Sequence, residues 1–297
     1  MLPAPFTPEF LDRLEALRLL ARKQFLGARS GNYSSPRRGT SLEFADYRRY
    51  APGDDLRYLD WGIYARTDRL YVKLFHEEVD LFVYLFVDAS ASMGYPARAG
   101  KFLPACHVAL ALAYVVLANQ DHVKLHLLQE GAAARVTPFY QGRQRLPDLV
   151  NFVSAADPHG QIDLAAALAE QLKGIRRPGK AILLSDFLMT PSVYQRGLNT
   201  LRPFNLDICV VQVLSPQEIE PPFARGGVEV VDCESGAEER LLWNERLRAD
   251  YRQLLERHNR ELRSFCHQAG IHYSLYVTDQ EMDEFVLETL PAIGLFK

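Results

Sequence analysis

The sequence predicts an α/β fold: a doubly wound, mostly parallel sheet with helices on both faces, preceded by an N-terminal helical and loop extension. Two observations predict it. Short apolar runs, such as residues 81–87 and 181–184, alternate with longer segments of helical periodicity, and strands that alternate with helices pair in parallel. Oxygen-bearing side chains follow two of these runs, at the strand ends where ligands bind in open parallel sheets.

The composition is that of an ordinary globular protein. The chain has 297 residues, of which 48% are hydrophobic, and a net charge of -3. It therefore has no bulk positive charge to favour nucleic acid or an anionic membrane. Its apolar runs fall short of the roughly 20 residues of a membrane span, and its start does not resemble a signal peptide. We expect a cytoplasmic protein with no nucleic-acid partner, no direct membrane insertion and no disulfide.

Residues 1–78 are expected to form an N-terminal domain that packs on a sheet domain of residues 79–297. Thr7 is a suitable N-cap for a helix that has Pro8 in its first turn. A loop rich in Gly, Ser and Arg follows. The next segment interleaves acidic and basic residues, which predicts a network of neutralised charges, and its aromatic residues are interpreted as anchors to the sheet.

The elements of the second domain can be read in order. Strands are expected at 81–87, 122–130, 133–139, 180–187, 206–214 and 272–278, and helices at 101–119, 146–154, 163–172 and 192–201. Residues 216–239 are rich in Pro, Gly and charge, which indicates an insertion containing a hairpin. A long helix with one apolar face follows it.

Asp88, Ser90 and Ser92 directly follow one apolar strand, and Asp186 follows another. Because parallel strands end at the same edge, both carboxylates are expected there. Carboxylate, hydroxyl and water oxygens are the ligands of a hard cation such as Mg²⁺. The pattern predicts a magnesium site, and Ca²⁺ or Mn²⁺ would suit the same ligands.

Two alternatives compete with the metal site. A nucleophilic serine needs a base and an oxyanion hole, and neither a G-x-S-x-G elbow nor a placed histidine is evident. A phosphoaspartate site needs an acid two residues after Asp88, where Ser90 stands. The structural alternative, in which Asp88 caps the following turn and the serines bond to backbone, stays open.

Two resemblances add to this interpretation. The stretches "DASASM", "GQIDLAAAL" and "LLSDF" resemble the metal-ion-dependent adhesion site of von Willebrand factor A domains. Upstream, residues 37–78, including "YAPGDDLRYLDWGIYAR", closely resemble the signature of the family catalogued as domain of unknown function 58. The signature residues are Arg48, Gly53, Asp54, Asp55, Arg57, Asp60, Trp61 and Arg66.

The metal loops match the adhesion-site pattern except in the second loop. Asp88, Ser90 and Ser92 match the first loop, and Asp186 matches the third. The usual threonine of the second loop is replaced by Ile162, which has no oxygen to offer. Asp163 is the neighbouring candidate for an inward-facing oxygen ligand.

The resemblance implies a bacterial or archaeal interaction module without enzymatic activity. Such a module binds a partner's acidic residue through Mg²⁺ and acts as an adaptor or assembly factor with a MoxR-type AAA+ ATPase or its client. The ATPase is another chain, since no G-x-x-x-x-G-K-[ST] occurs here. One alternative is a scaffold with a degenerate, metal-free site. The other is a metal-dependent hydrolase using Asp54, Asp55 or Asp60, although nearby arginines make such acids poor proton donors and acceptors.

Overall fold

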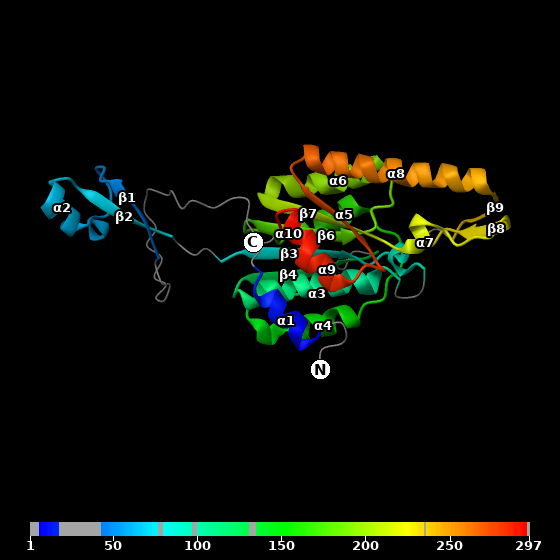
Figure 1. Cartoon of the computed structure of the whole chain (residues 1–297), viewed down its shortest axis with the longest axis horizontal. Coiled ribbons are helices and arrows are strands. Elements are labelled where there is room, and N and C mark those ends of the chain that lie inside the picture. Colours follow the sequence, from blue (N-terminus) through cyan, green and yellow to red (C-terminus); the bar gives the residue numbers. More distant parts are fainter. Residues whose placement is uncertain are drawn as a thin grey trace. The chain divides into compact units, whose positions relative to one another are not determined.

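The computed structural model describes residues 6–17, 43–76, 80–96, 100–130, 135–234 and 236–295. The chain divides into two compact units, Met1–Arg22 with Leu81–Lys297, and Lys23–Asp80 (Figure 1). This grouping differs from the expected domains of residues 1–78 and 79–297, because the N-terminal helix packs with the sheet. Whether the signature segment packs on the sheet domain stays a prediction.

The larger unit is built on a six-stranded sheet with the order β10-β7-β6-β3-β4-β5. Its strands are β3 (Phe82–Asp88), β4 (His122–Leu128), β5 (Arg135–Val136), β6 (Gly179–Ser185), β7 (Leu206–Leu214) and β10 (His272–Val277). All neighbours pair in parallel except the edge strand β5, which is antiparallel to β4. β3 and β6 are buried along their whole length, as expected of strands covered on both faces. The predicted fold class is confirmed.

Helices cover both faces of this sheet (Figure 1). One core contains α1 (Pro8–Glu15), α3 (Phe102–Ala118), α4 (Leu146–Ser154) and the C-terminal segment with α9 (Met282–Glu284) and α10 (Leu290–Ala292). The other contains α5 (Leu164–Leu172), α6 (Pro191–Leu201) and the C-terminal half of α8 (Glu245–Gln268). Within the described residues, no helix is long and apolar enough to cross a membrane.

α1 packs against α3 in the first core. The Thr7 hydroxyl accepts a hydrogen bond from the Phe10 amide at 3.2 Å, so the predicted N-cap is confirmed. Phe10 and Leu14 are buried in the first core. The phenol of Tyr114 on α3 donates to Glu15 at 2.7 Å. Because α3 lies between the sheet and α1, nearly its whole circumference is apolar and buried.

The smaller unit is an antiparallel pair, β1 (Glu43–Arg49) and β2 (Tyr71–His76). A 3₁₀ turn at Leu56–Tyr58 and the helix α2 (Trp61–Thr67) lie between its strands. Asp60 caps α2 by accepting a hydrogen bond from the Ile63 amide at 3.0 Å. The signature residues of the sequence therefore form a hairpin that carries one short helix.

The predicted insertion is confirmed as a short helix followed by a hairpin. α7 (Pro216–Ile219) begins directly after β7, and β8 (Gly226–Val231) pairs antiparallel with β9 (Glu238–Trp243). The ring of Trp243 lies 5.2 Å from that of Phe223 and 6.3 Å from that of Tyr251 on α8. These contacts fix the base of the hairpin to the start of α8.

Candidate metal centre

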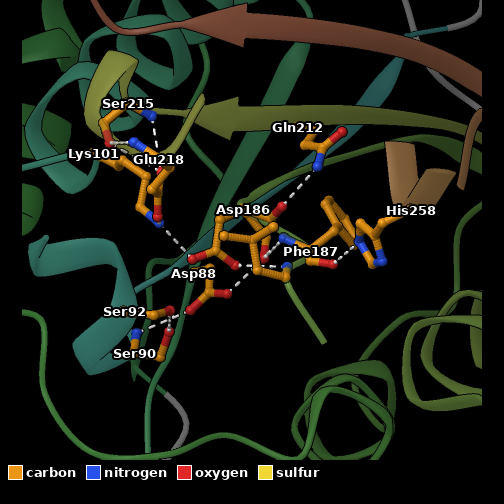
Figure 2. Close-up of polar contacts among 12 residues, drawn as sticks. Asp88, Ser90, Ser92, Lys101, Asp186, Phe187, Gln212, Ser215, Glu218 and His258 are labelled. Atoms are coloured by element: carbon orange, nitrogen blue, oxygen red, sulfur yellow. Dashed lines mark hydrogen bonds and ion pairs between the residues drawn. The ribbon is translucent and has the colours of Figure 1, made fainter. Parts of the chain in front are cut away.

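The two carboxylates expected at one sheet edge do lie together. β3 and β6 are parallel neighbours in a register that sets Val87 opposite Leu184. Asp88 is the last residue of β3, and Asp186 directly follows β6. Both side chains therefore emerge at the C-terminal edge of the sheet, where Figure 2 shows them beside each other.

Asp88 is a fully buried carboxylate that receives two hydrogen bonds from neutral groups. Its Oδ1 accepts a hydrogen bond from the Ser90 amide at 2.9 Å, and its Oδ2 accepts one from the Ser185 hydroxyl at 2.6 Å. Among the described residues, no basic side chain forms an ion pair with it. Burial, and next the repulsion from Asp186, raise the pKa of Asp88 to about 6. Its ionised form is therefore destabilised, and a bound cation would relieve that penalty.

Ser90 and Ser92 add two hydroxyls from the same loop. Their Oγ atoms lie 3.1 Å apart (Figure 2). The Ala91 amide donates to the carbonyl of Gly160 at 2.9 Å, which ties the first loop to the second. The bond from the Ser90 amide to Asp88 is the one expected of a turn cap. It is compatible with metal binding, because each carboxylate oxygen has a further lone pair.

Asp186 is held by a buried ammonium group, that of Lys101 at the start of α3. Lys101 is 0% exposed, and its Nζ donates to Asp186 Oδ2 at 2.7 Å and also to Glu218 of α7. Burial alone lowers the pKa of Lys101, but the two carboxylates outweigh it and raise the pKa above its ordinary value. The charge of Asp186 is thus balanced by Lys101, whereas among the described residues no ion pair balances that of Asp88.

Sequence reasoning missed Lys101, Glu218 and Gln212. A lysine at the start of a wholly apolar helix was a usable signal, because a buried lysine needs a carboxylate. The Ser215–Glu218 capping box was another, since a helix start directly after β7 places its acid at this edge. Gln212, whose amide donates to the backbone carbonyl of Asp186 at 3.0 Å, lies within a buried strand and gave no signal.

The structure does not bring Asp163 to these residues. As the N-cap of α5, it accepts hydrogen bonds from the Ala165 and Ala166 amides at 2.9 and 3.1 Å. Its other oxygen pairs with Arg196 at 2.9 Å. The Ala166 amide is the main cause that lowers the pKa of Asp163. Ile162 packs against the core that contains α5 and α6, and the oxygen ligand expected of Asp163 is not found at the site.

The remaining oxygen atoms of the candidate site fit a hard cation. Asp88, Ser90 and Ser92 present one carboxylate and two hydroxyls from one loop, and Asp186 lies opposite, the set that Mg²⁺ accepts together with water. The buried, uncompensated Asp88 is the observation that favours a cation. In the described part of the chain, no three His, Cys, Asp or Glu side chains gather as a metal cluster. A site with three such ligands, for a soft or a hard metal, is therefore not found there, and the candidate site has two carboxylates and two hydroxyls.

The acids of the signature segment are paired, as expected. The pairs are Arg48–Asp54 at 2.8 Å, Arg57–Asp55 at 2.6 Å and Lys73–Asp60 at 3.1 Å. Hydrogen bonds from Arg48 and Arg57 lower the pKa of Asp54 and Asp55. The Ile63 amide and next Lys73 lower the pKa of Asp60 to about 2. Such carboxylates are poor general acids and bases at neutral pH.

The other signature residues shape this hairpin. Gly53 has φ +103° in the turn after β1, a conformation that favours glycine. Arg66 donates to the carbonyl of Gly62 at 3.1 Å. Trp61 begins α2, is 63% exposed and meets Tyr64 edge to face at 6.2 Å.

Known proteins resemble this chain in sequence. The family described as "Protein of unknown function DUF58" matches residues 46–261. The protein Rv1480 of Mycobacterium tuberculosis is 28% identical over 260 residues, covering 86% of this chain and 80% of that protein. The protein MAV169 of Mycobacterium avium is 26% identical over 148 residues, covering 48% of this chain and 85% of that protein.

Two solved structures show a distant likeness. The conserved hypothetical protein BatB from Bacteroides thetaiotaomicron has a TM-score of 0.42 and 12% identity, covering 72% of this chain and 98% of that one. The manganese-loaded TRAP protein of Plasmodium vivax has a TM-score of 0.33 and 22% identity, covering 44% and 56%. The family match extends over both the signature hairpin and the metal loops, and the chain belongs to the DUF58 family.

Proposed function

We propose that this chain is a protein-interaction module without enzymatic activity, which binds an acidic side chain of a protein partner through Mg²⁺. The observation that carries the proposal is Asp88, a buried carboxylate that faces a second carboxylate and has no cation of its own. Such a group either takes up a proton or is stabilised in its ionised form by a cation, and the proposal is that a bound cation does so here.

Each residue has a distinct part in this proposal. Asp88, Ser90 and Ser92 would hold the cation, and Asp186, already bonded to Lys101, would orient a water molecule on it. When bound, the cation supplies the positive charge that lets an incoming carboxylate approach two others. Ser185 and Gln212 keep the two loops in place through Asp88 Oδ2 and the Asp186 carbonyl.

The partner that we propose is a MoxR-type AAA+ ATPase or its client, with the interaction in the cytoplasm. The support is the resemblance of the signature segment and the metal loops to that family's pattern. The paired acids of the smaller unit favour interaction over the hydrolase alternative, because the lowered pKa values of Asp54, Asp55 and Asp60 make these three carboxyl groups poorly suited to proton transfer.

A second candidate is a scaffold whose site works without metal. Two observations favour it: Lys101 already balances Asp186, and Ile162 removes one ligand. In this alternative, partner binding is indifferent to divalent cations.

A capture experiment separates the two. The immobilised chain is mixed with a MoxR-type ATPase from the same organism in Mg²⁺ or in EDTA. We expect capture in Mg²⁺ only, lost in Asp88→Asn and kept in Asp148→Asn. Asp148 of α4 serves as the control because it lies in an exposed ion pair with Arg145, the residue before that helix. Capture that is equal in EDTA would support the scaffold and contradict the metal-dependent module.

A further inference from the structure

One residue beside the candidate metal site has a strained backbone. Phe187, which directly follows Asp186, has φ +52°, in the left-handed region that bulky side chains rarely adopt, and its side chain is fully buried. The other described non-glycine residues with positive φ are polar: Asp68, Gln120 and Asn205. A bulky residue keeps such a conformation only where surrounding contacts stabilise it, and such residues gather at binding sites. The contacts that hold Phe187 are therefore candidates for a functional role.

The left-handed turn at Phe187 orients the carboxylate of Asp186. It brings the chain back so that the Leu188 amide donates to Asp186 Oδ1 at 3.1 Å. The Phe187 amide donates to the Ser185 hydroxyl at 3.1 Å, and this hydroxyl in turn donates to Asp88 Oδ2 at 2.6 Å. The backbone conformation of one residue thus supports hydrogen bonds to both carboxylates of the candidate site.

The helix α8 supplies a contact that holds this turn. The imidazole Nε2 of His258 lies 2.8 Å from the carbonyl oxygen of Phe187 (Figure 2). Because a carbonyl oxygen can only accept a hydrogen bond, Nε2 carries the hydrogen and donates it. The imidazole ring is itself fixed, since it packs edge to face on the buried ring of Tyr194, with 5.9 Å between the ring centres. The position of the Phe187 carbonyl therefore depends on a helix that lies 71 positions further along the chain.

The next residue of α8 supports the preceding carbonyl through a bridge. The side-chain amide of Gln212 donates to the carbonyl of Asp186 at 3.0 Å and to Asn259 Oδ1 at 3.0 Å. His258 and Asn259 are adjacent on α8, so one position of this helix holds two successive carbonyls, those of Asp186 and Phe187. The third loop, which follows β6, is thus fixed to α8 at two consecutive peptide groups.

We propose that His258 is a positioning residue of the candidate metal site: by holding Phe187 in its left-handed conformation, it directs the carboxylate of Asp186 toward Asp88. The proposal rests on the proposed function, since it assigns a further residue to the same site. His258 acts on the peptide group after Asp186 and is not itself a ligand. Without its hydrogen bond the third loop relaxes toward an ordinary backbone conformation, and the affinity for the cation falls. Loss of an outer contact of this kind lowers metal affinity by about 10–100-fold.

The test compares variants of the full chain with the wild type. His258→Leu removes the donor and keeps a side chain of similar size, and His258→Asn repeats the loss with a polar side chain that is too short to reach the carbonyl. His258→Gln restores an N–H group at about the distance of Nε2. The matched control is Leu262→Ala, because Leu262 is fully buried one turn further along α8 and its side chain makes no hydrogen bond.

Two measurements are made on each protein. Hydrogen–deuterium exchange in EDTA reports the third loop without any cation, and we expect faster exchange in residues 185–190 for His258→Leu and His258→Asn only. Calorimetric titration with Mg²⁺ is expected to give a Kd about tenfold higher for these two variants, and about the wild-type Kd for His258→Gln and Leu262→Ala.

Three results would overturn the proposal and leave the metal site in place. They are unchanged exchange of the third loop in His258→Leu and His258→Asn, a Kd for Mg²⁺ that Leu262→Ala raises as much as His258→Leu does, and a Kd that His258→Gln does not restore. If the wild type binds no Mg²⁺ while exchange of the third loop still depends on His258, the proposed function fails. His258 then has a structural role alone, and this proposal fails as well.

Discussion

Asp88→Asn gives a quantitative test of the charge imbalance at the sheet edge. The pKa of Asp88 is raised from 3.8 to about 6, which corresponds to about 3 kcal/mol against the ionised form in the folded chain. A group whose folded pKa is raised favours folding while it is protonated. This contribution is present below pH 4 and is lost as the pH rises through 6. Asparagine removes the charge and retains an oxygen for the Ser90 amide.

The assay is urea unfolding of the wild type and Asp88→Asn in EDTA, at pH 4 and at pH 7. Any hydrogen bond that asparagine makes less well affects the variant equally at both pH values. The difference in the free energy of unfolding between variant and wild type is therefore expected to shift by about 3 kcal/mol in favour of the variant between pH 4 and pH 7. Addition of Mg²⁺ at pH 7 is expected to stabilise the wild type and leave the variant unchanged.

An equal stability difference at both pH values would refute the reasoning. It would mean that Asp88 is ionised without penalty in the metal-free chain, because a cation of the protein or a water network compensates it.

Three further predictions concern the surroundings of the site. Burial lowers the pKa of His126, whose Nδ1 lies 2.7 Å from Gln171 Oε1, to about 4. The free energy of unfolding is therefore expected to fall by about 3 kcal/mol as the pH falls from 6.5 to 4. His126→Asn should remove that part of the pH profile of urea unfolding, and an unaltered profile would refute the prediction. Lys101→Met leaves the charge of Asp186 uncompensated, so it should lower the free energy of unfolding in EDTA by about 3–5 kcal/mol and increase the stabilisation by Mg²⁺. A decrease of less than about 1 kcal/mol in urea unfolding would contradict this. Ile162→Thr should lower the Kd for Mg²⁺ in calorimetry by returning a hydroxyl to the second loop, and a Kd that does not fall would show that this loop does not face the cation.

The sequence was sufficient for the fold and for the meeting of Asp88 and Asp186 at one edge of the sheet. The continuous apolar runs that end at Asp88 and Asp186 required a sheet covered on both faces, and parallel pairing then required one common edge. These inferences depend on local patterns and on a rule of topology. The structure agrees with them because β3 and β6 are neighbours.

The charge balance of the site depends on contacts between distant segments. Lys101 and Glu218 are 117 positions apart, and they meet only because α3 and α7 both begin at the C-terminal edge of the sheet. Asp163 was misjudged for a local reason, since an aspartate directly before a helix satisfies its own backbone amides first.

The most direct test of the proposed metal centre is a calorimetric titration of the wild-type chain with Mg²⁺ at pH 7, repeated with Asp88→Asn. We expect saturable binding of one Mg²⁺ per chain in the wild type and none in the variant. The absence of saturable heat in the wild type, or the same Kd in both proteins, would contradict a cation held by Asp88.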